Sequence, residues 1–89
     1  MIKKIESFIE LLKRDYPRSN PVLETFPSGA AMLNLNVGMI TYVMEYLPSQ
    51  KGFGVSRMDT ATFGWEGVEA SFDTFDDTAK YLLGLLKRD

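Results

Sequence analysis

The chain contains no cysteine and no histidine among its 89 residues. Without cysteine it cannot form a disulfide, a thiolate nucleophile or a sulfur-ligated metal site. Without histidine it lacks the central residue of Ser-His-Asp and Cys-His catalysis, of the commonest zinc sites and of haem ligation. Any catalysis would depend on carboxylates, lysine, tyrosine or arginine. We therefore expect no cofactor and no metal, and the two absences argue against an enzyme.

A surplus of positive charge and a long apolar run are also absent. The chain has 10 Lys and Arg against 12 Asp and Glu, a net charge of −2, whereas nucleic-acid binders usually carry a basic patch. No apolar stretch approaches the about 18 residues of a membrane helix. Glu6 and Glu10 interrupt the segment where a signal peptide would be apolar. We expect a cytoplasmic protein with neither a nucleic acid nor a membrane as partner.

The remaining composition is that of a folded protein. Hydrophobic residues make up 45% and charged residues 25% of the chain. A chain of this length buries roughly 60–65% of the surface that it exposes when unfolded, which is enough for one modest core. The sequence thus predicts that residues 1–89 form a single small domain.

Two segments have the spacing of amphipathic helices. In Ile2–Tyr16 apolar residues recur every three or four positions, and Pro17 ends the pattern. In Thr74–Arg88 a similar stripe follows Thr74, a good N-cap residue, and Asp77 stands where a capping box places its acidic residue. A helix is expected near each end of the sequence.

The segments between these helices alternate as strands do. Gly38 after Asn36 and Val37 indicates a tight hairpin turn in this region. Residues Asp59–Gly67 fit a strand, a loop or a helical turn capped by Asp59. The expected strands are Val22–Phe26, Ala31–Val37, Met39–Leu47, Phe53–Met58 and, at the end, Gly67–Phe72.

This order of elements has no β-α-β alternation, so a parallel sheet is disfavoured. The predicted fold class is α+β. It consists of an antiparallel sheet of four to five strands with the N-terminal and C-terminal helices packed on one face, an αβββ(β)βα two-layer sandwich.

Two local patterns suggest chemistry but have simpler explanations. Asp73, Asp76 and Asp77 gather at the start of the last helix, where the helix dipole favours carboxylates, and they lack the spacing of a calcium-binding loop. Gly52-Phe53-Gly54 precedes a strand, whereas phosphate-binding glycine loops open a helix. A turn at the start of a hairpin, or a β-bulge, accounts for these glycines.

The strand Met39–Leu47 is apolar on both faces, which is typical of a strand that is covered twice or offers one side to a partner. Aromatic residues and arginine on such a face are typical of protein interfaces and of single-stranded RNA platforms, whereas the burial statistics of tyrosine favour the core for Tyr42 and Tyr46. The acidic balance and the lack of an RNP1-like run disfavour RNA. The candidate interface residues are Tyr42, Met44, Tyr46, Arg57 and Trp65.

We expect a small non-enzymatic protein-binding or regulatory module, which binds a protein partner or itself, as a homodimer, through the open face of the sheet. The alternative is a small-ligand binder or a histidine-independent enzyme with carboxylates at a sheet-edge or dimer cleft. Its candidate residues are Asp59, Glu66, Glu69 and Asp73, with Lys51, Arg57 or Tyr42. The sequence identifies neither the partner nor the ligand.

Overall fold

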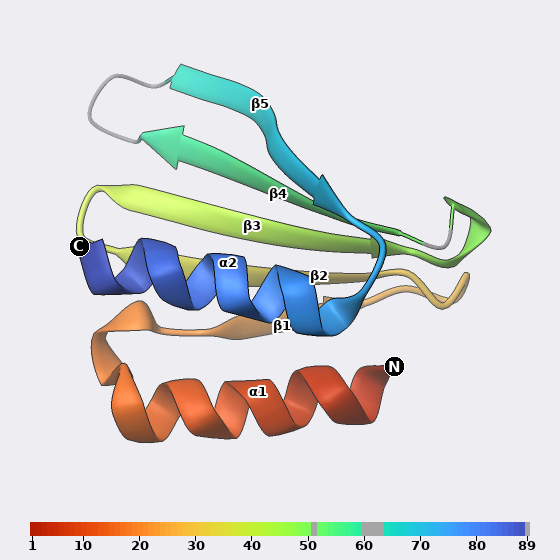
Figure 1. Cartoon of the computed structure of the whole chain (residues 1–89), viewed down its shortest axis with the longest axis horizontal. Helices are drawn as coiled ribbons and strands as arrows, with labels where there is room; N and C mark the ends of the chain where they lie inside the picture. Colours follow the sequence, from red (N-terminus) through yellow and green to blue (C-terminus); the bar gives the residue numbers. More distant parts are fainter. Residues whose placement is uncertain (51, 60–63, 89) are drawn as a thin grey trace.

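A computed structural model describes residues 1–50, 52–59 and 64–88, and it shows an α+β fold (Figure 1). The described residues form one five-stranded sheet with the strand order β1-β2-β3-β4-β5. Every strand pairs antiparallel with its neighbour in the sequence, so the sheet is a meander. The predicted α+β class with an antiparallel sheet and two terminal helices is confirmed.

The elements are two long helices, two short 3₁₀ turns and the five strands. In chain order they are α1 Ile2–Asp15, η1 Pro17–Ser19, β1 Val22–Thr25, β2 Ala31–Val37, β3 Ile40–Leu47, η2 Pro48–Gln50, β4 Gly52–Asp59, β5 Gly64–Phe72 and α2 Phe75–Arg88.

Several element boundaries differ from the sequence prediction, most of all around the connection between β4 and β5. Asp59 ends β4, so of the alternatives left open for this residue the strand is correct, and the last strand begins at Gly64 rather than Gly67. β5 pairs with β4 through two register shifts, between Val55 and Met58, which interrupt the alternation that reveals a strand. Residues 60–63 lie outside the described part of the chain.

The tightest connection in the sheet joins β2 to β3. Val37 pairs with Ile40, so the turn consists of Gly38 and Met39 rather than starting at Asn36. Gly38 has a φ of 62°, as the first position of a two-residue hairpin loop favours, and Met39 is 60% exposed. Met39 therefore belongs to the turn and not to the strand.

Both helices pack on the same face of the sheet, which we call the covered face; the opposite face is the open face. Figure 1 shows the two helices running in the same direction along the strands. The strand side chains beneath them belong to one hydrophobic cluster with both helices. Its members are Ile5, Phe8 and Leu12 of α1, Ala31, Leu33, Leu35, Tyr42, Met44, Phe53 and Val55 of the sheet, and Phe75, Leu82 and Leu86 of α2.

Aromatic rings join the two layers of the covered face. The Phe8 and Phe75 rings meet edge to face with centroids 5.8 Å apart, which links α1 to α2. The Phe75 ring also lies 6.0 Å from that of Phe53 in β4, and Phe53 lies 5.0 Å from Tyr46 in β3. The helices are thus fixed to each other and to the central strands.

Thr74 caps α2, as the sequence predicts. Its Oγ1 accepts a hydrogen bond from the backbone N–H of Asp77 at 3.2 Å. We expect Thr74→Ala to lower the free energy of unfolding by about 1 kcal/mol, because that N–H loses its partner. Urea denaturation measures this loss, and Thr74→Ser, which keeps the hydroxyl, is the control. Equal midpoints for Thr74→Ala and the parent chain would show that the cap contributes nothing.

Neither α1 nor α2, as far as residues 1–50, 52–59 and 64–88 describe the chain, combines the length and hydropathy that a membrane span requires.

Candidate functional site

The structure places most of the predicted interface residues on the covered face. Tyr42 and Met44 are 3% and 0% exposed and belong to the core. Tyr46 is half-buried and packs against the same cluster, and Arg57 pairs with Tyr42 across β3 and β4. These four residues therefore do not line the open face, which corrects the expectation that they form the interface; for Tyr42 the core alternative is confirmed. The physical reason is that this side of β3 packs against the helices.

Trp65, the fifth candidate, lies in β5, where its backbone pairs with Met58. Its side chain lies outside the described part of the structure.

The open face follows from the register of the strands. Side chains alternate along a strand, so the residues between the core positions point away from the helices. In the described strands these are Val22 and Glu24 of β1, Met32, Asn34 and Asn36 of β2, Thr41, Val43, Glu45 and Leu47 of β3, Gly52, Gly54, Ser56 and Met58 of β4, and Ser71 of β5.

The centre of the open face is buried, and exposed apolar side chains lie towards its rim. Val43 is 4% exposed although it is not part of the core cluster, and Ser56, its partner in β4, is 2% exposed. Towards the rim Val22 and Leu47 are 50% and 36% exposed. An antiparallel sheet that faces only water usually carries polar side chains there, so exposed apolar residues mark a candidate binding surface.

The charged side chains described on this face all have one sign. Among the described open-face side chains Glu24 and Glu45 are charged, and there is no lysine or arginine. Near the β2–β3 turn, Thr41 Oγ1 donates a hydrogen bond to Asn36 Oδ1 at 2.9 Å. The surface is therefore mildly acidic, with apolar and hydrogen-bonding groups side by side.

Gly52 and Gly54 produce a depression in the open face. Because they are two residues apart in β4, both lack a side chain on the same side of the sheet. The resulting hollow, which we call the glycine trough, has a volume of 310 Å³. Its lining residues are Glu45 and Leu47 of β3, Gln50, Gly52, Phe53 and Gly54, and Ser71, Phe72 and Asp73.

The explanation predicted for these glycines is correct in part. Gly52 does begin β4, as a glycine at the start of a hairpin would. The irregular pairing, however, lies between Val55 and Met58 rather than at the glycines. Sequence reasoning missed the trough, although two glycines at strand spacing are a readable sign of a gap on one face.

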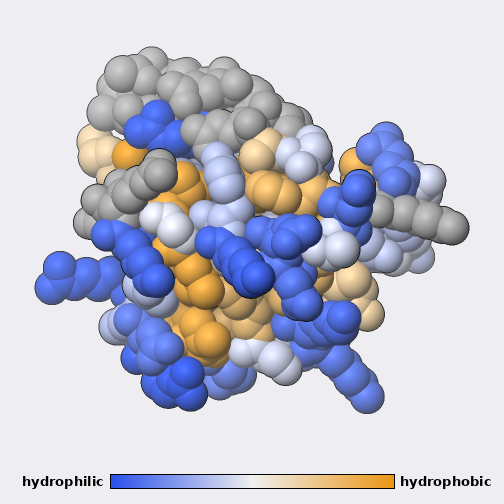
Figure 2. Space-filling model, viewed as in Figure 1, coloured by the Kyte–Doolittle hydropathy of each residue, from blue (hydrophilic) through white to orange (hydrophobic). Residues whose placement is uncertain are grey.

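The covered side of the molecule has hollows of its own along the seam between the helices. Figure 2 shows hydrophobic residues in this seam, with hydrophilic side chains on both sides. Near the start of both helices it opens into a hollow of 340 Å³. Lys4, Ser7, Phe8, Leu11, Phe75 and Asp76 line it.

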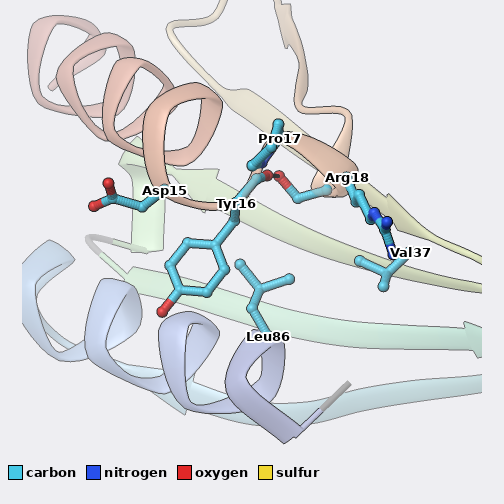
Figure 3. A pocket seen from close by; sticks show the side chains of 7 residues that line it. Asp15, Tyr16, Pro17, Arg18, Val37 and Leu86 are labelled. Carbon is cyan, nitrogen blue, oxygen red and sulfur yellow. Dashed lines mark hydrogen bonds between the residues drawn. The ribbon is translucent and has the colours of Figure 1, made fainter.

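A second hollow, of 260 Å³, lies where both helices end (Figure 3). The Tyr16 ring points towards Leu86 of α2. Asp15 lines this hollow, and Arg14 donates hydrogen bonds from Nε and Nη2 to its carboxylate at 3.0 and 3.2 Å. These bonds lower the pKa of Asp15. The residues that line the hollow are Asp15, Tyr16, Pro17, Arg18, Ser19, Val37 and Leu86. This hollow is a mostly apolar gap between the ends of the two helices.

The residues of the alternative, carboxylate-based site are not brought together. Asp73 lines the trough on the open face, whereas Tyr42 lies in the core on the covered face. Arg57 pairs with Tyr42 and shares its face. Within the described residues no three acidic side chains are grouped in a way that could hold a metal ion. The side chains of Lys51, Asp59, Glu66 and Glu69 lie outside the described part of the structure.

Comparisons with protein-family models, with curated proteins and with solved structures found no match for this chain. Its own residues and their geometry are therefore the basis for inferring a function.

Proposed function

We propose that this chain is a protein-binding module and that the open face of its sheet receives the partner, either another protein or a second copy of the chain. One observation carries the proposal. Both helices pack on one face, and the other face presents the exposed apolar side chains of Val22 and Leu47. Burying such residues against a partner removes apolar surface from water, which is the main driving force of protein association.

The chemistry of the face favours protein over nucleic acid. Glu24 and Glu45 would repel a phosphate backbone, and no basic side chain among the described open-face residues would attract one. Apolar side chains next to asparagine and threonine, by contrast, match the mixed composition of protein interfaces.

The test is purification of the tagged chain from its source cells, with mass spectrometry and light scattering of the eluate. We expect the parent chain to retain a stoichiometric partner or to elute as a dimer, and the Met32→Asp/Leu47→Asp double variant to lose this association. The reason is that two new carboxylates would be desolvated at the interface.

Lys80→Ala is the matched control, because Lys80 is exposed on α2, away from the open face. It should associate like the parent chain. If the double variant remains folded by circular dichroism and still associates normally, the open face is not the interface.

A second candidate function, small-ligand binding, is favoured by the trough, where Glu45 and Asp73 line one hollow. A ligand that binds the native state raises the melting temperature, so a thermal-shift screen with divalent metals, nucleotides and sugars tests this function. A ligand that stabilises the parent chain but not Asp73→Asn would support it. A screen without any shift would count against it.

A further inference from the structure

The backbone conformation and the surroundings of Gly52 do not require a glycine in the glycine trough. A Cβ atom added at Gly52 would meet the carbonyl oxygens of Phe72 and Gln50 at 3.5 and 3.6 Å, which is ordinary van der Waals contact. A positive φ occurs at Gly29 and Gly38, where the backbone favours glycine, but not at Gly52. An alanine would therefore fit at this position. What glycine provides there is empty space on the open face.

The walls of the trough carry negative charge from two separate elements. Glu45 extends from β3 on one side; it pairs with Gly54, which in turn pairs with Ser71. Asp73 follows the end of β5 on the other side. Neither carboxylate forms an ion pair with any residue in the described part of the chain. The position between these walls is electrostatically suited to a cation.

The size and the lining of the trough restrict the occupant further. A volume of 310 Å³ is at the lower end of the about 300–1,000 Å³ typical of ligand pockets, so it suits one long side chain better than a nucleotide or another large cofactor. Along the length of the trough, the glycine Cα atoms and Leu47, which is 36% exposed, offer apolar contact. Lysine and arginine combine an apolar stem with a charged end, and so match both parts of the lining.

We propose that the glycine trough binds a lysine or arginine side chain of the partner protein. The stem lies over Gly52 and Gly54 against Leu47, and the charged end lies between Glu45 and Asp73. This inference rests on the proposed function, because it specifies the chemistry of the partner that docks on the open face.

The experiment is an NMR titration of the ¹⁵N-labelled full chain with Nα-acetyl-lysinamide. Nα-acetyl-norleucinamide, which has the stem without the charge, is the control ligand. We expect the lysine compound to shift the backbone amides of Gly54 and Ser71 in a saturable manner, and the norleucine compound to leave them nearly unchanged. Glu45→Gln should weaken the binding by about threefold or more, as expected for a partly exposed ion pair.

Two further variants complete the test. Gly52→Val should fill the trough and abolish the shifts, and its side chain is compatible with a strand. Glu24→Gln makes the same chemical change as Glu45→Gln on the same face but outside the trough, so it should bind like the parent chain.

The inference is overturned if the lysine compound causes no saturable shift at Gly54 and Ser71, or if Gly52→Val and Glu45→Gln bind it like the parent chain. Either result leaves the proposed function standing, provided that association in source cells still depends on Met32 and Leu47. Loss of that dependence would refute docking on the open face, whatever the titration shows.

Discussion

Tyr42→Glu is expected to unfold the protein. Tyr42 is 3% exposed and packs in the core between the sheet and the helices, so a glutamate there would bury a carboxylate in a largely apolar environment, with only Arg57 of β4 opposite it. The cost is about 4 kcal/mol or more, a large part of the about 5–15 kcal/mol by which native proteins are stable. Near-ultraviolet circular dichroism and size-exclusion chromatography measure the loss of packing.

Leu47→Glu is the matched control for this variant. Leu47 lies in the same strand on the open face and is 36% exposed, so its replacement leaves the charge in contact with water. We expect this variant to keep the native spectrum. A Tyr42→Glu variant that also kept its native spectrum would remove Tyr42 from the core and would contradict the assignment of the two faces.

Leu33→Ala is expected to have the second largest effect. Leu33 is fully buried in β2, where it pairs with Leu23 on one side and Met44 on the other. Truncating a buried leucine removes transfer free energy and leaves a cavity, which together cost about 2–5 kcal/mol. Urea denaturation should show a lower midpoint with an unchanged slope.

Leu47→Ala is the control for Leu33→Ala, because it makes the same chemical change at a partly exposed site. Leu47→Ala removes the same atoms from a partly exposed site, so the free energy of unfolding should change by about 0.5 kcal/mol or less. If the two variants lost equal stability, the difference in burial between Leu33 and Leu47 would not describe the protein in solution.

Local sequence patterns were sufficient to predict most of the secondary structure. The stripe that begins at Ile2 and the cap at Thr74 depend on residues a few positions apart, and both helices form where they were expected. The same holds for β2 and β3, which are joined by a two-residue turn at Gly38. Such features are visible in a sequence because their causes are local.

The face covered by the helices was harder to predict, because both sides of β3 contain apolar residues. The pairing of the strands resolves this ambiguity. Asn34 and Asn36 of β2 lie opposite Val43 and Thr41, so the polar side of β2 continues across β3. Glu45 lies on that same side. Polarity compared across two strands, rather than along one, would have placed Tyr42 in the core.

The last strand was predicted too short for a different reason. Ser56 pairs with Val68 and Met58 with Trp65, so β5 contains an extra residue between Trp65 and Val68, where the predicted strand began. An extra residue reverses the alternation of the side chains and hides the strand from a search for period two. The glycine trough escaped prediction because it depends on β3, β4 and the turn after β5 together.

The contact between Phe8 and Phe75 joins segments that are far apart in the chain, whereas each strand pairs with its sequence neighbour. Closing a long loop costs more entropy than closing a hairpin, so we expect the meander to form early in folding and the two helices to meet late. Interactions that form after the transition state slow unfolding rather than speed folding. The helix pair would then determine how long a folded molecule lasts, while the hairpins determine how quickly it forms.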